Sequence, residues 1–299
     1  MDITKAFKNE RLLKAVTGVT ALEFETLFTI FERLLREIAV KKPRQRAVGA
    51  GRKGRIKSAP QKLFFLLFYL KVYPTYDLAS LLFQADRSRI CRWVGQWMPV
   101  LEQALGRACV LPARRVSDMN AFLSRFPQVQ DLLIDGTERV TQRPAKSRNQ
   151  HRRYSGKKKT YTRKNIIATD VNKRILLLFP TKNGRRHDKW RAEQTGWLKA
   201  IPPTTTLWVD TGFMGIEKQT QQGVRIMRPQ KSSKKRPLSP EQRSDNRVIS
   251  VLRVVCEHSL AGIKRFGALF FPYRNRRGQD DRFISIAAGL WNFHLNLAT

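Results

Sequence analysis

Apolar residues follow two different patterns along this chain of 299 residues. Up to about residue 106 they recur every three or four positions, which is the spacing of one face of an α-helix. From residue 128 onward they gather in short runs bounded by turn-forming residues, which is typical of strands. The sequence therefore predicts a helical part followed by a part that contains a sheet.

The N-terminal region over residues 1–40 is predicted to be helical. Thr20 and Glu23 have the spacing of a capping box, in which each residue binds the backbone N–H of the other at a helix start. Residues 41–58 follow with many Gly, Lys and Arg residues and no apolar periodicity. We expect this stretch to be a basic linker or arm.

A second group of helices is predicted for a domain over residues 59–108. It divides into helices over 60–73, 76–84 and 87–98, and Pro99 ends or kinks the last one. Two helices joined by a tight turn, the second with an Arg-rich outer face, are typical of a helix-turn-helix DNA-binding domain. The candidate DNA-binding residues are Arg87, Ser88, Arg89 and Arg92. An ordinary helical bundle with solvated arginines is the alternative.

The second part of the chain, over residues 125–299, predicts an α/β domain. Strands are expected over residues 129–134, 161–169, 174–179, 205–209 and 224–227, with a hairpin turn over 170–173. Helices are expected over 187–200, over 216–222 and from Ser239 to about residue 266, where Ser239, Pro240 and Gln242 form a strong start signal. Strands followed by alternating helices and strands favour a mixed sheet with flanking helices.

The charge of the chain points to its partner. Lys and Arg number 58 against 23 Asp and Glu, which gives a net charge of +35 and a pI of about 11.1. Such a basic surface binds nucleic acid phosphates by releasing counterions. The longest apolar run, residues 63–70, is much shorter than the ~20 residues of a membrane span. With no signal peptide, disulfide framework or zinc-binding Cys pair, the sequence predicts a cytoplasmic protein without a membrane contact.

Three acidic residues are candidates for catalysis in this acid-poor chain. Asp135 and Asp210 each follow an apolar run directly and precede a glycine-containing turn. Carboxylates at strand ends can converge at one edge of a sheet, although an Asp in such a place also serves simply as a turn former. On the last long helix, Arg253, Glu257 and Lys264 share one narrow stripe. An exposed Arg–Glu pair on a solvated face is the alternative there.

Carboxylate oxygens favour hard divalent cations. Two Asp and one Glu suit Mg²⁺ or Mn²⁺ better than zinc. Two such ions about 4 Å apart can activate a nucleophile and stabilise the leaving oxygen at a phosphate. The sequence therefore predicts a two-metal site, with Mg²⁺ as the expected ion and Mn²⁺ as a substitute.

The same residues resemble a known family, the bacterial insertion-sequence transposases of the DDE type in the branch related to Harbinger elements. The matching segments are Asp135–Glu138, Gln142–Pro144, Tyr154–Lys159, His187–Asp188, Asp210–Phe213, Arg253-x3-Glu257-x6-Lys264 and the helix-turn-helix region over 75–97. Ser250 stands where the last motif of the family usually has a tyrosine, and Gln84 where the turn often has glycine.

The resemblance implies an RNase H-like catalytic domain in which Asp135, Asp210 and Glu257 hold the metal ions. It also implies that Arg253 and Lys264 contact the DNA backbone. Lys157, Lys158 and Lys159 are expected to contact phosphates, with a solvated basic edge as the alternative. His187 is expected to orient a helix start, and a general base is the other interpretation.

The function implied is that of a transposase on double-stranded DNA in the bacterial nucleoid. It would bind the terminal inverted repeats of its insertion sequence, cleave the DNA with metal-activated water and transfer the strand to a target. Because two ends are joined, a homo-oligomer on DNA is expected. A DNA-binding regulator derived from a transposase and a basic RNA-binding structural protein are the alternatives.

Overall fold

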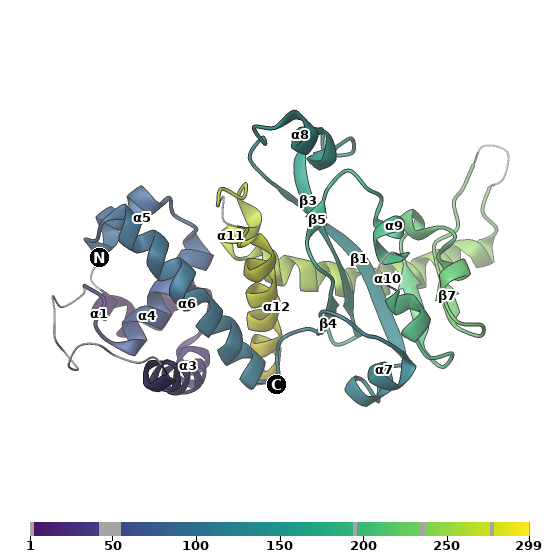
Figure 1. The fold of residues 1–299 in the computed structure, drawn as a ribbon. Helices are drawn as coiled ribbons and strands as arrows, with labels where there is room; N and C mark the ends of the chain where they lie inside the picture. The colour runs from purple at the N-terminus through teal and green to yellow at the C-terminus, as the bar shows by residue number, and fades with distance from the viewer. Residues whose placement is uncertain (1–2, 42–54, 194–195, 234–236, 276–277, 299) are drawn as a thin grey trace. The chain divides into compact units, whose positions relative to one another are not determined.

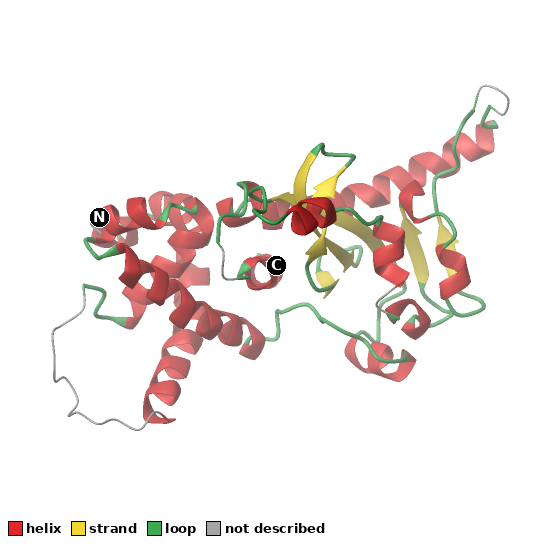
Figure 2. Ribbon diagram, turned by 45° about the horizontal axis from the view of Figure 1, so that its top comes forward, coloured by secondary structure: helices red, strands yellow, loops and turns green. Residues whose placement is uncertain are grey.

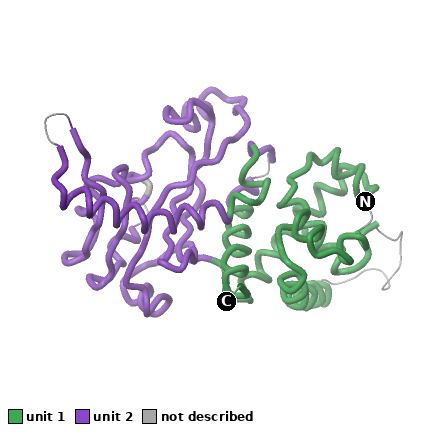
Figure 3. Tube along the Cα trace, turned by 180° about the vertical axis from the view of Figure 1, so that it is seen from behind, with its two compact units in different colours: residues 1–111, 263–271, 282–299 green, residues 112–262, 272–281 purple. Residues whose placement is uncertain are grey.

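The computed structural model describes residues 3–41, 55–193, 196–233, 237–275 and 278–298, and Figure 1 shows its helices and strands. The chain forms two compact units, coloured separately in Figure 3. The first unit consists of residues 1–111, 263–271 and 282–299, and the second of residues 112–262 and 272–281. Most of the expected basic linker, residues 42–54, lies outside the described residues.

The first unit is helical (Figure 2). Its helices are α1 (Ile3–Phe7), α2 (Glu10–Thr17), α3 (Ala21–Lys41), α4 (Ala59–Val72), α5 (Tyr76–Phe83), α6 (Arg87–Arg107), α11 (Gly267–Phe270) and α12 (Asp280–Leu297), of which the first two residues of α12 belong to the second unit. Most of the C-terminal helix therefore belongs to the same unit as the N-terminal residues.

Helix α4 forms the centre of the first unit. Every residue from Leu63 to Leu70 is buried, because α4 has apolar side chains on all its faces and packs against α2, α3, α6 and α11. The ring of Phe65 makes edge-on contacts with Phe83 of α5 and with Trp93 of α6. The longest apolar run of the sequence is therefore a buried core helix.

The N-terminal region is helical, as predicted, and its described residues form three helices, α1, α2 and α3. Gly18 ends α2 with φ of +79°, a left-handed conformation that favours glycine. A Cβ atom on Gly18 would lie 2.8 Å from the ring of Phe266, so the bend also allows close packing. The predicted capping box is confirmed, since the Thr20 N–H donates to Glu23 Oε2 at 2.8 Å and the Glu23 N–H donates to Thr20 Oγ1 at 3.2 Å.

The predicted pair of helices with a tight turn is confirmed as α5 and α6. Gln84 makes the turn with φ of +49°, so glutamine adopts the left-handed conformation in which glycine is more usual. Helix α6 continues through Pro99 to Arg107, so of the two expectations for Pro99, the one in which it ends the helix is wrong. The buried apolar face of α6 also continues beyond the proline, and this packing holds the helix together.

The second unit contains the predicted mixed sheet. Its strands are β1 (Asp131–Val140), β2 (Tyr154–Ser155), β3 (Thr160–Thr169), β4 (Ile175–Leu178), β5 (Lys182–Asn183), β6 (Thr206–Val209) and β7 (Arg225–Met227), in the order β2-β3-β1-β6-β7, with β4 and β5 also paired to β3. Strands β1, β6 and β7 run parallel, and β3 runs antiparallel to β1.

Strand β1 is longer than the sequence predicts. The apolar run ends at Ile134, yet the strand continues to Val140 because residues 135–140 remain paired with β3. Polar side chains replace apolar ones in this half, and hydrophobic periodicity alone does not detect a strand of that kind. Asp135 therefore lies within β1 rather than after its end.

The helices of the second unit are α7 (Met119–Arg125), α8 (Ser147–Arg153), α9 (Asp188–Glu193) and α10 (Pro240–Lys264), with 3₁₀ helices η1 (Trp197–Ala200), η2 (Thr211–Phe213) and η3 (Ile216–Gln219). The expected helix over 187–200 is wrong in its middle, because Gly196 takes φ of +69° between α9 and η1. Trp197, Leu198 and Ala200 of η1 join the apolar core against Ile134 of β1.

The start of α10 is confirmed. The Gln242 N–H donates to Ser239 Oγ at 3.1 Å, and the Ser239 N–H donates to Gln242 Oε1 at 3.0 Å. The predicted hairpin turn is also confirmed, since Asp170 Oδ1 accepts from the N–H groups of Asn172 and Arg174. Local hydrogen bonds of this kind explain why short motifs predicted both elements.

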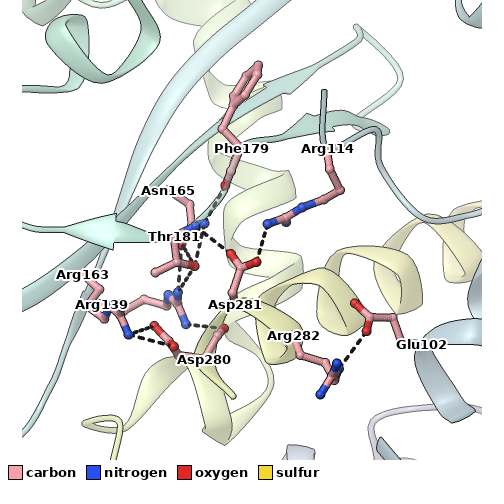
Figure 4. Close-up of polar contacts among 10 residues, drawn as sticks. All are labelled: Glu102, Arg114, Arg139, Arg163, Asn165, Phe179, Thr181, Asp280, Asp281 and Arg282. Atoms are coloured by element: carbon pink, nitrogen blue, oxygen red, sulfur yellow. Dashed lines mark hydrogen bonds and ion pairs between the residues drawn. The ribbon is translucent and has the colours of Figure 1, made fainter. Parts of the chain in front are cut away.

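A buried polar network ties the polar half of β1 to the segment that begins α12 (Figure 4). Arg139, only 5% exposed, donates to the carbonyl of Asp280 at 3.2 Å and to Asn165 Oδ1 at 2.8 Å. Arg163 of β3 pairs with the Asp280 carboxylate at 2.9 Å, and the Thr181 N–H donates to Asp281 at 2.6 Å. The network adds buried charged and polar contacts to the backbone ladder that pairs β1 with β3.

Candidate active site

The topology of the sheet brings Asp135 and Asp210 together. Parallel strands β1 and β6 end their pairing at Ile134 and Val209, and the two aspartates are the next residue on each strand. Strand β6 ends there, whereas β1 continues with β3 as its partner. Both carboxylates therefore lie at the carboxyl end of β6, the kind of edge at which ligands bind in open α/β sheets.

Each aspartate is held by a short local hydrogen bond. Asp135 Oδ1 accepts from the N–H of Gly136 at 2.7 Å, and Asp210 Oδ1 accepts from the N–H of Thr211 at 2.7 Å. Asp210 is also the N-cap residue of η2. A second carboxylate oxygen in each side chain remains available to a ligand that approaches the edge of the sheet.

Negative charge accumulates around Asp135. Burial raises the pKa of its carboxyl group, and the nearby carboxylates of Asp210 and Asp188 raise it further. The Gly136 N–H and the Arg253 guanidinium lower the pKa and offset only part of this effect. Bringing a cation to this edge would relieve the repulsion among the carboxylates.

Helix α10 supplies Arg253 to this edge. Its Nη1 atom lies 3.4 Å from Asp210 Oδ1, and the side chain is about 29% exposed. The helix is fixed across the sheet by Ser259, whose Oγ donates to the carbonyl of Lys173 at 2.7 Å. Cys256 is buried on the same side, where burial raises the pKa of its thiol to about 12. Arg253 thus faces a carboxylate in this structure.

Glu257 and Lys264 are placed differently from Arg253. Glu257 is exposed on α10, and its charge, like that of Asp135, acts on the buried thiol of Cys256. Lys264 is half-buried at the end of α10 and belongs to the first unit. Across the described ranges, no three His, Cys, Asp or Glu side chains gather closely enough to hold a metal ion. The structure therefore brings together two of the three predicted metal ligands.

The chemistry of these side chains fits a divalent cation. Carboxylate oxygens are the donors that Mg²⁺ and Mn²⁺ prefer, and Asp135 and Asp210 are adjacent in an environment of excess negative charge. Asp135 and Asp210 could hold a metal ion, with Arg253 as the cation that faces them otherwise.

Asp188 is the residue near Asp135 that the sequence did not assign to the site. It is the first residue of α9, and a Cβ atom on Gly136 would lie 2.7 Å from its carboxyl carbon. The His187–Asp188 motif is the sequence signal that could have found it. His187 itself is exposed and immediately precedes α9.

The predicted DNA-binding residues of the first unit lie at the start of α6. Arg87, Ser88 and Arg92 are exposed, and Arg89 is partly exposed. Ile90 on the opposite side is completely buried. Arg87 makes an exposed ion pair with Asp77 of α5, with 3.4 Å between Nε and Oδ1. The helix start therefore presents basic side chains to solvent, where a DNA groove could receive them.

The second basic group also lies on the surface. Lys157, Lys158 and Lys159 are all exposed in the turn between β2 and β3. Lys159 takes φ of +48° at the end of this turn. The preceding helix, α8, has no buried residue.

Comparison with known proteins identifies the family. The family model described as DDE superfamily endonuclease matches residues 134–292, more than half of the chain. The chain belongs to the DDE superfamily endonucleases. A second model, the helix-turn-helix of DDE superfamily endonuclease, matches residues 55–107, which contain α5 and α6. Together they make the protein an enzyme of the DDE transposase type with an N-terminal helix-turn-helix.

A curated relative supports the same assignment. The chain is 28% identical over 299 residues to a protein of Microchaete diplosiphon named "Probable transposase for insertion sequence element IS702", with 99% of each chain covered. Membership of the DDE superfamily endonucleases implies the use of divalent metal ions. Among the described residues, none of the helices has the length and apolar character needed to cross a membrane.

Proposed function

We propose that this DDE enzyme is the transposase of its own insertion sequence. The helix-turn-helix would bind the terminal inverted repeats through Arg87, Ser88, Arg89 and Arg92. The catalytic unit would then cleave the DNA at the ends and join them to a target. Like other enzymes on bacterial DNA, it would work in the cytoplasm on the nucleoid, and the need to join two ends implies a homo-oligomer.

Asp135 and Asp210 would hold the metal ions, with Glu257 as the third ligand after a movement of its side chain toward the sheet edge. Two Mg²⁺ ions, or Mn²⁺ in their place, would supply charge stabilisation at the phosphate and lower the pKa of a bound water. Arg253 would exchange its ion pair with Asp210 for a contact with the DNA backbone, while Lys264 and Lys157–159 would bind flanking phosphates.

The chemistry consists of two in-line displacements at phosphorus. In the first, a water oxygen forms a bond to the phosphorus, and the bond from phosphorus to the 3′-oxygen breaks, which leaves a 3′-hydroxyl at the element end. In the second, that hydroxyl forms a bond to a phosphorus of the target DNA and displaces a 3′-oxygen there. In both steps negative charge develops on the attacking and leaving oxygens at the reacting phosphorus, so one set of carboxylates would serve both.

The observation that carries this proposal is the pairing of Asp135 and Asp210 on adjacent parallel strands. A chain with a net charge of +35 attracts DNA overall, yet at this edge it concentrates carboxylates. Bare carboxylates would repel phosphate, whereas carboxylates that hold divalent cations attract it. This group of carboxylates in an otherwise basic chain therefore supports a metal-dependent phosphoryl transfer site at the sheet edge.

A nicking assay tests the proposal. The substrate is the DNA that flanks the gene on each side, labelled and incubated with the protein and Mg²⁺. We expect nicks at the element ends, a complete loss of nicking in Asp210→Asn, and DNA binding within about twofold of the unchanged protein. Asp245→Asn, an exposed aspartate of α10, is the matched control and should cut normally.

The same assay decides between the enzyme and a regulator derived from it. The regulator alternative has one observation in its favour, which is that Glu257 is not gathered with the two aspartates among the described residues. If the protein binds the element ends specifically but never nicks them with Mg²⁺ or Mn²⁺, the regulator is correct. If Asp210→Asn still nicks, the proposed site is wrong.

A further inference from the structure

The connection between β1 and β3, residues 141–159, carries charge of one sign. Eight of its 19 residues are Lys or Arg, against 58 of 299 in the whole chain, and none is Asp or Glu. Arg153 is half-buried, and the other seven basic side chains are exposed. These seven are Arg143, Lys146, Arg148, Arg152 and Lys157–159. We call residues 141–159 the basic arm.

Helix α8 of the basic arm is polar on every side. None of its residues is buried, whereas a helix of a folded domain ordinarily buries one apolar face. Arg148 and Arg152 are four positions apart and therefore lie on one side of the helix, where like charges repel each other. The helix contains no Asp or Glu that could pair with them. A polyanion would supply the opposite charge that α8 lacks.

The base of the basic arm is anchored to the sheet. The Thr141 N–H donates to the carbonyl of Tyr161 in β3 at 2.8 Å, and β2 pairs antiparallel with β3 at the other end of the arm. Gln150 Nε2 of α8 donates to the carbonyl of Pro144 at 2.8 Å. These bonds tie α8 to the preceding chain and tie both ends of the arm to β3, so its charges are presented from a fixed place on the sheet.

The side chains of the basic arm fit the backbone of duplex DNA. Lys and Arg bind phosphates by releasing counterions, and such contacts position a protein on DNA without reading its sequence. Proteins that bind single strands ordinarily add aromatic rings on which bases stack. The one Phe, Tyr or Trp residue of the arm is Tyr154, and its ring packs edge-on against Tyr161 with 5.9 Å between centroids. Charge rather than base stacking therefore defines the ligand.

The length of β1 sets the distance between the basic arm and the proposed metal site. Thr141 comes six residues after Asp135 along this strand, and at about 3.4 Å per residue these span about 20 Å. Figure 1 shows α8 beyond the end of β3. Because duplex DNA rises about 3.4 Å per base pair, 20 Å corresponds to about six base pairs. A duplex that passes both places meets the arm about half a helical turn from Asp135.

We propose that the basic arm binds the backbone of the duplex that is being cleaved, about six base pairs from the reacting phosphate, through Arg148 and Arg152. The inference rests on the proposed function, because this position is counted from the phosphate that Asp135 and Asp210 would hold. The arm sets the direction in which the duplex leaves the catalytic unit, whereas the helix-turn-helix selects the sequence.

Hydroxyl-radical footprinting of the full-length protein on element-end DNA tests the inference. The parent protein is Asp210→Asn, which should bind without cutting, and the unchanged protein with Mg²⁺ marks the position of the nick. Adding Arg148→Gln and Arg152→Gln to the parent should remove protection about five to eight base pairs from the nick and leave protection elsewhere. The dependence of log K on log salt should become shallower by about 2, since each lost phosphate contact contributes about 0.9.

Two control variants separate charge from structure. Arg148→Lys with Arg152→Lys keeps both charges and should restore the footprint and the salt dependence. Arg125→Gln with Lys199→Gln removes two exposed charges from α7 and η1, which precede β1 and β6, and should leave both unchanged. The glutamine changes in α8 should not unfold it, because they remove a repulsion between like charges.

The result that overturns the inference is an unchanged footprint and an unchanged salt dependence in the protein with glutamine at positions 148 and 152. An equal effect of the Arg125 and Lys199 changes would also overturn it, because any loss of positive charge would then act alike. If the unchanged protein never nicks the element ends, the proposed function fails, while the salt dependence still decides whether the basic arm binds DNA.

Discussion

Asp280 offers the most severe test of how the catalytic unit is held together. Its side chain is only 3% exposed and lies 2.9 Å from the Arg163 guanidinium. Arg139 is buried beside it, and burial lowers the pKa of Arg139 to about 10 while the charge of Asp280 raises it. Asp280→Asn would leave the buried Arg139 and the partly exposed Arg163 beside a neutral amide.

The expected cost follows from the burial of these groups. Breaking a buried ion pair by removing one partner costs about 3–5 kcal/mol, because the remaining charge is left uncompensated. Asp281, whose charge also raises the pKa of Arg139, offsets part of this. For a unit of this size each kcal/mol lowers Tm by about 2–4 °C. The two ranges together give a fall in Tm of roughly 6–20 °C, and the compensation by Asp281 moves the expected value toward the lower end.

Hydrogen exchange of the β1 and β3 amides is the assay, because it reports on the strands that carry Arg139 and Arg163. Asp245→Asn, which removes an exposed carboxylate from α10, controls for the change in net charge and should have little effect. If Asp280→Asn lowers the stability of these strands by less than about 1 kcal/mol, the buried network is not what fixes them, and this reasoning is refuted.

Three further outcomes are expected. Because the pKa of Asp135 is raised in the folded protein, the folded state holds this proton more tightly than the unfolded chain, and the resulting stability is lost as pH rises through the raised pKa. In EDTA at neutral pH, Asp135→Asn should thus be more stable than the unchanged protein. The gain in the free energy of unfolding should be about 1.4 kcal/mol for each tenfold by which folding tightens proton binding to Asp135, and it should vanish near pH 4. An equal gain at both pH values would contradict this. Thr20→Ala removes the cap of α3 and should cost about 1 kcal/mol in urea unfolding, whereas no loss would mean that the capping box contributes nothing. Replacing Lys157–159 with glutamine should make the dependence of log K on log salt shallower by about 2–3 if each lysine binds a phosphate, and an unchanged slope in a filter-binding titration would show that they do not touch DNA.

The sequence predicted the elements whose signal is local. Capping boxes at Thr20 and at Ser239 were correct, because two neighbouring side chains and backbone N–H groups decide a helix start. The positions of α5 and α6 were predicted to within one residue at their starts, because apolar spacing and turn residues mark both. The sequence did not predict which strands pair, and the parallel pairing of β1 with β6 is seen only in the structure.

Features that depend on tertiary contacts were beyond the sequence. The polar half of β1 is a strand because β3 pairs with it and Arg139 finds Asn165 and Asp280, which are remote in the chain. Likewise Asp188 was assigned no role, since its approach depends on the empty space at Gly136. Periodicity reports which face is apolar, and it carries no information on such polar contacts.

The location of the metal ion is the central claim, and iron-directed cleavage tests it most directly. Fe²⁺ takes the place of Mg²⁺ in the full-length protein, and ascorbate with peroxide then generates hydroxyl radicals that cut the polypeptide beside the bound ion. We predict cuts near residues 134–136 and 209–211 that excess Mg²⁺ suppresses and that Asp210→Asn removes. Cuts confined to other segments, or cuts that persist in Asp210→Asn, would contradict a metal site formed by Asp135 and Asp210.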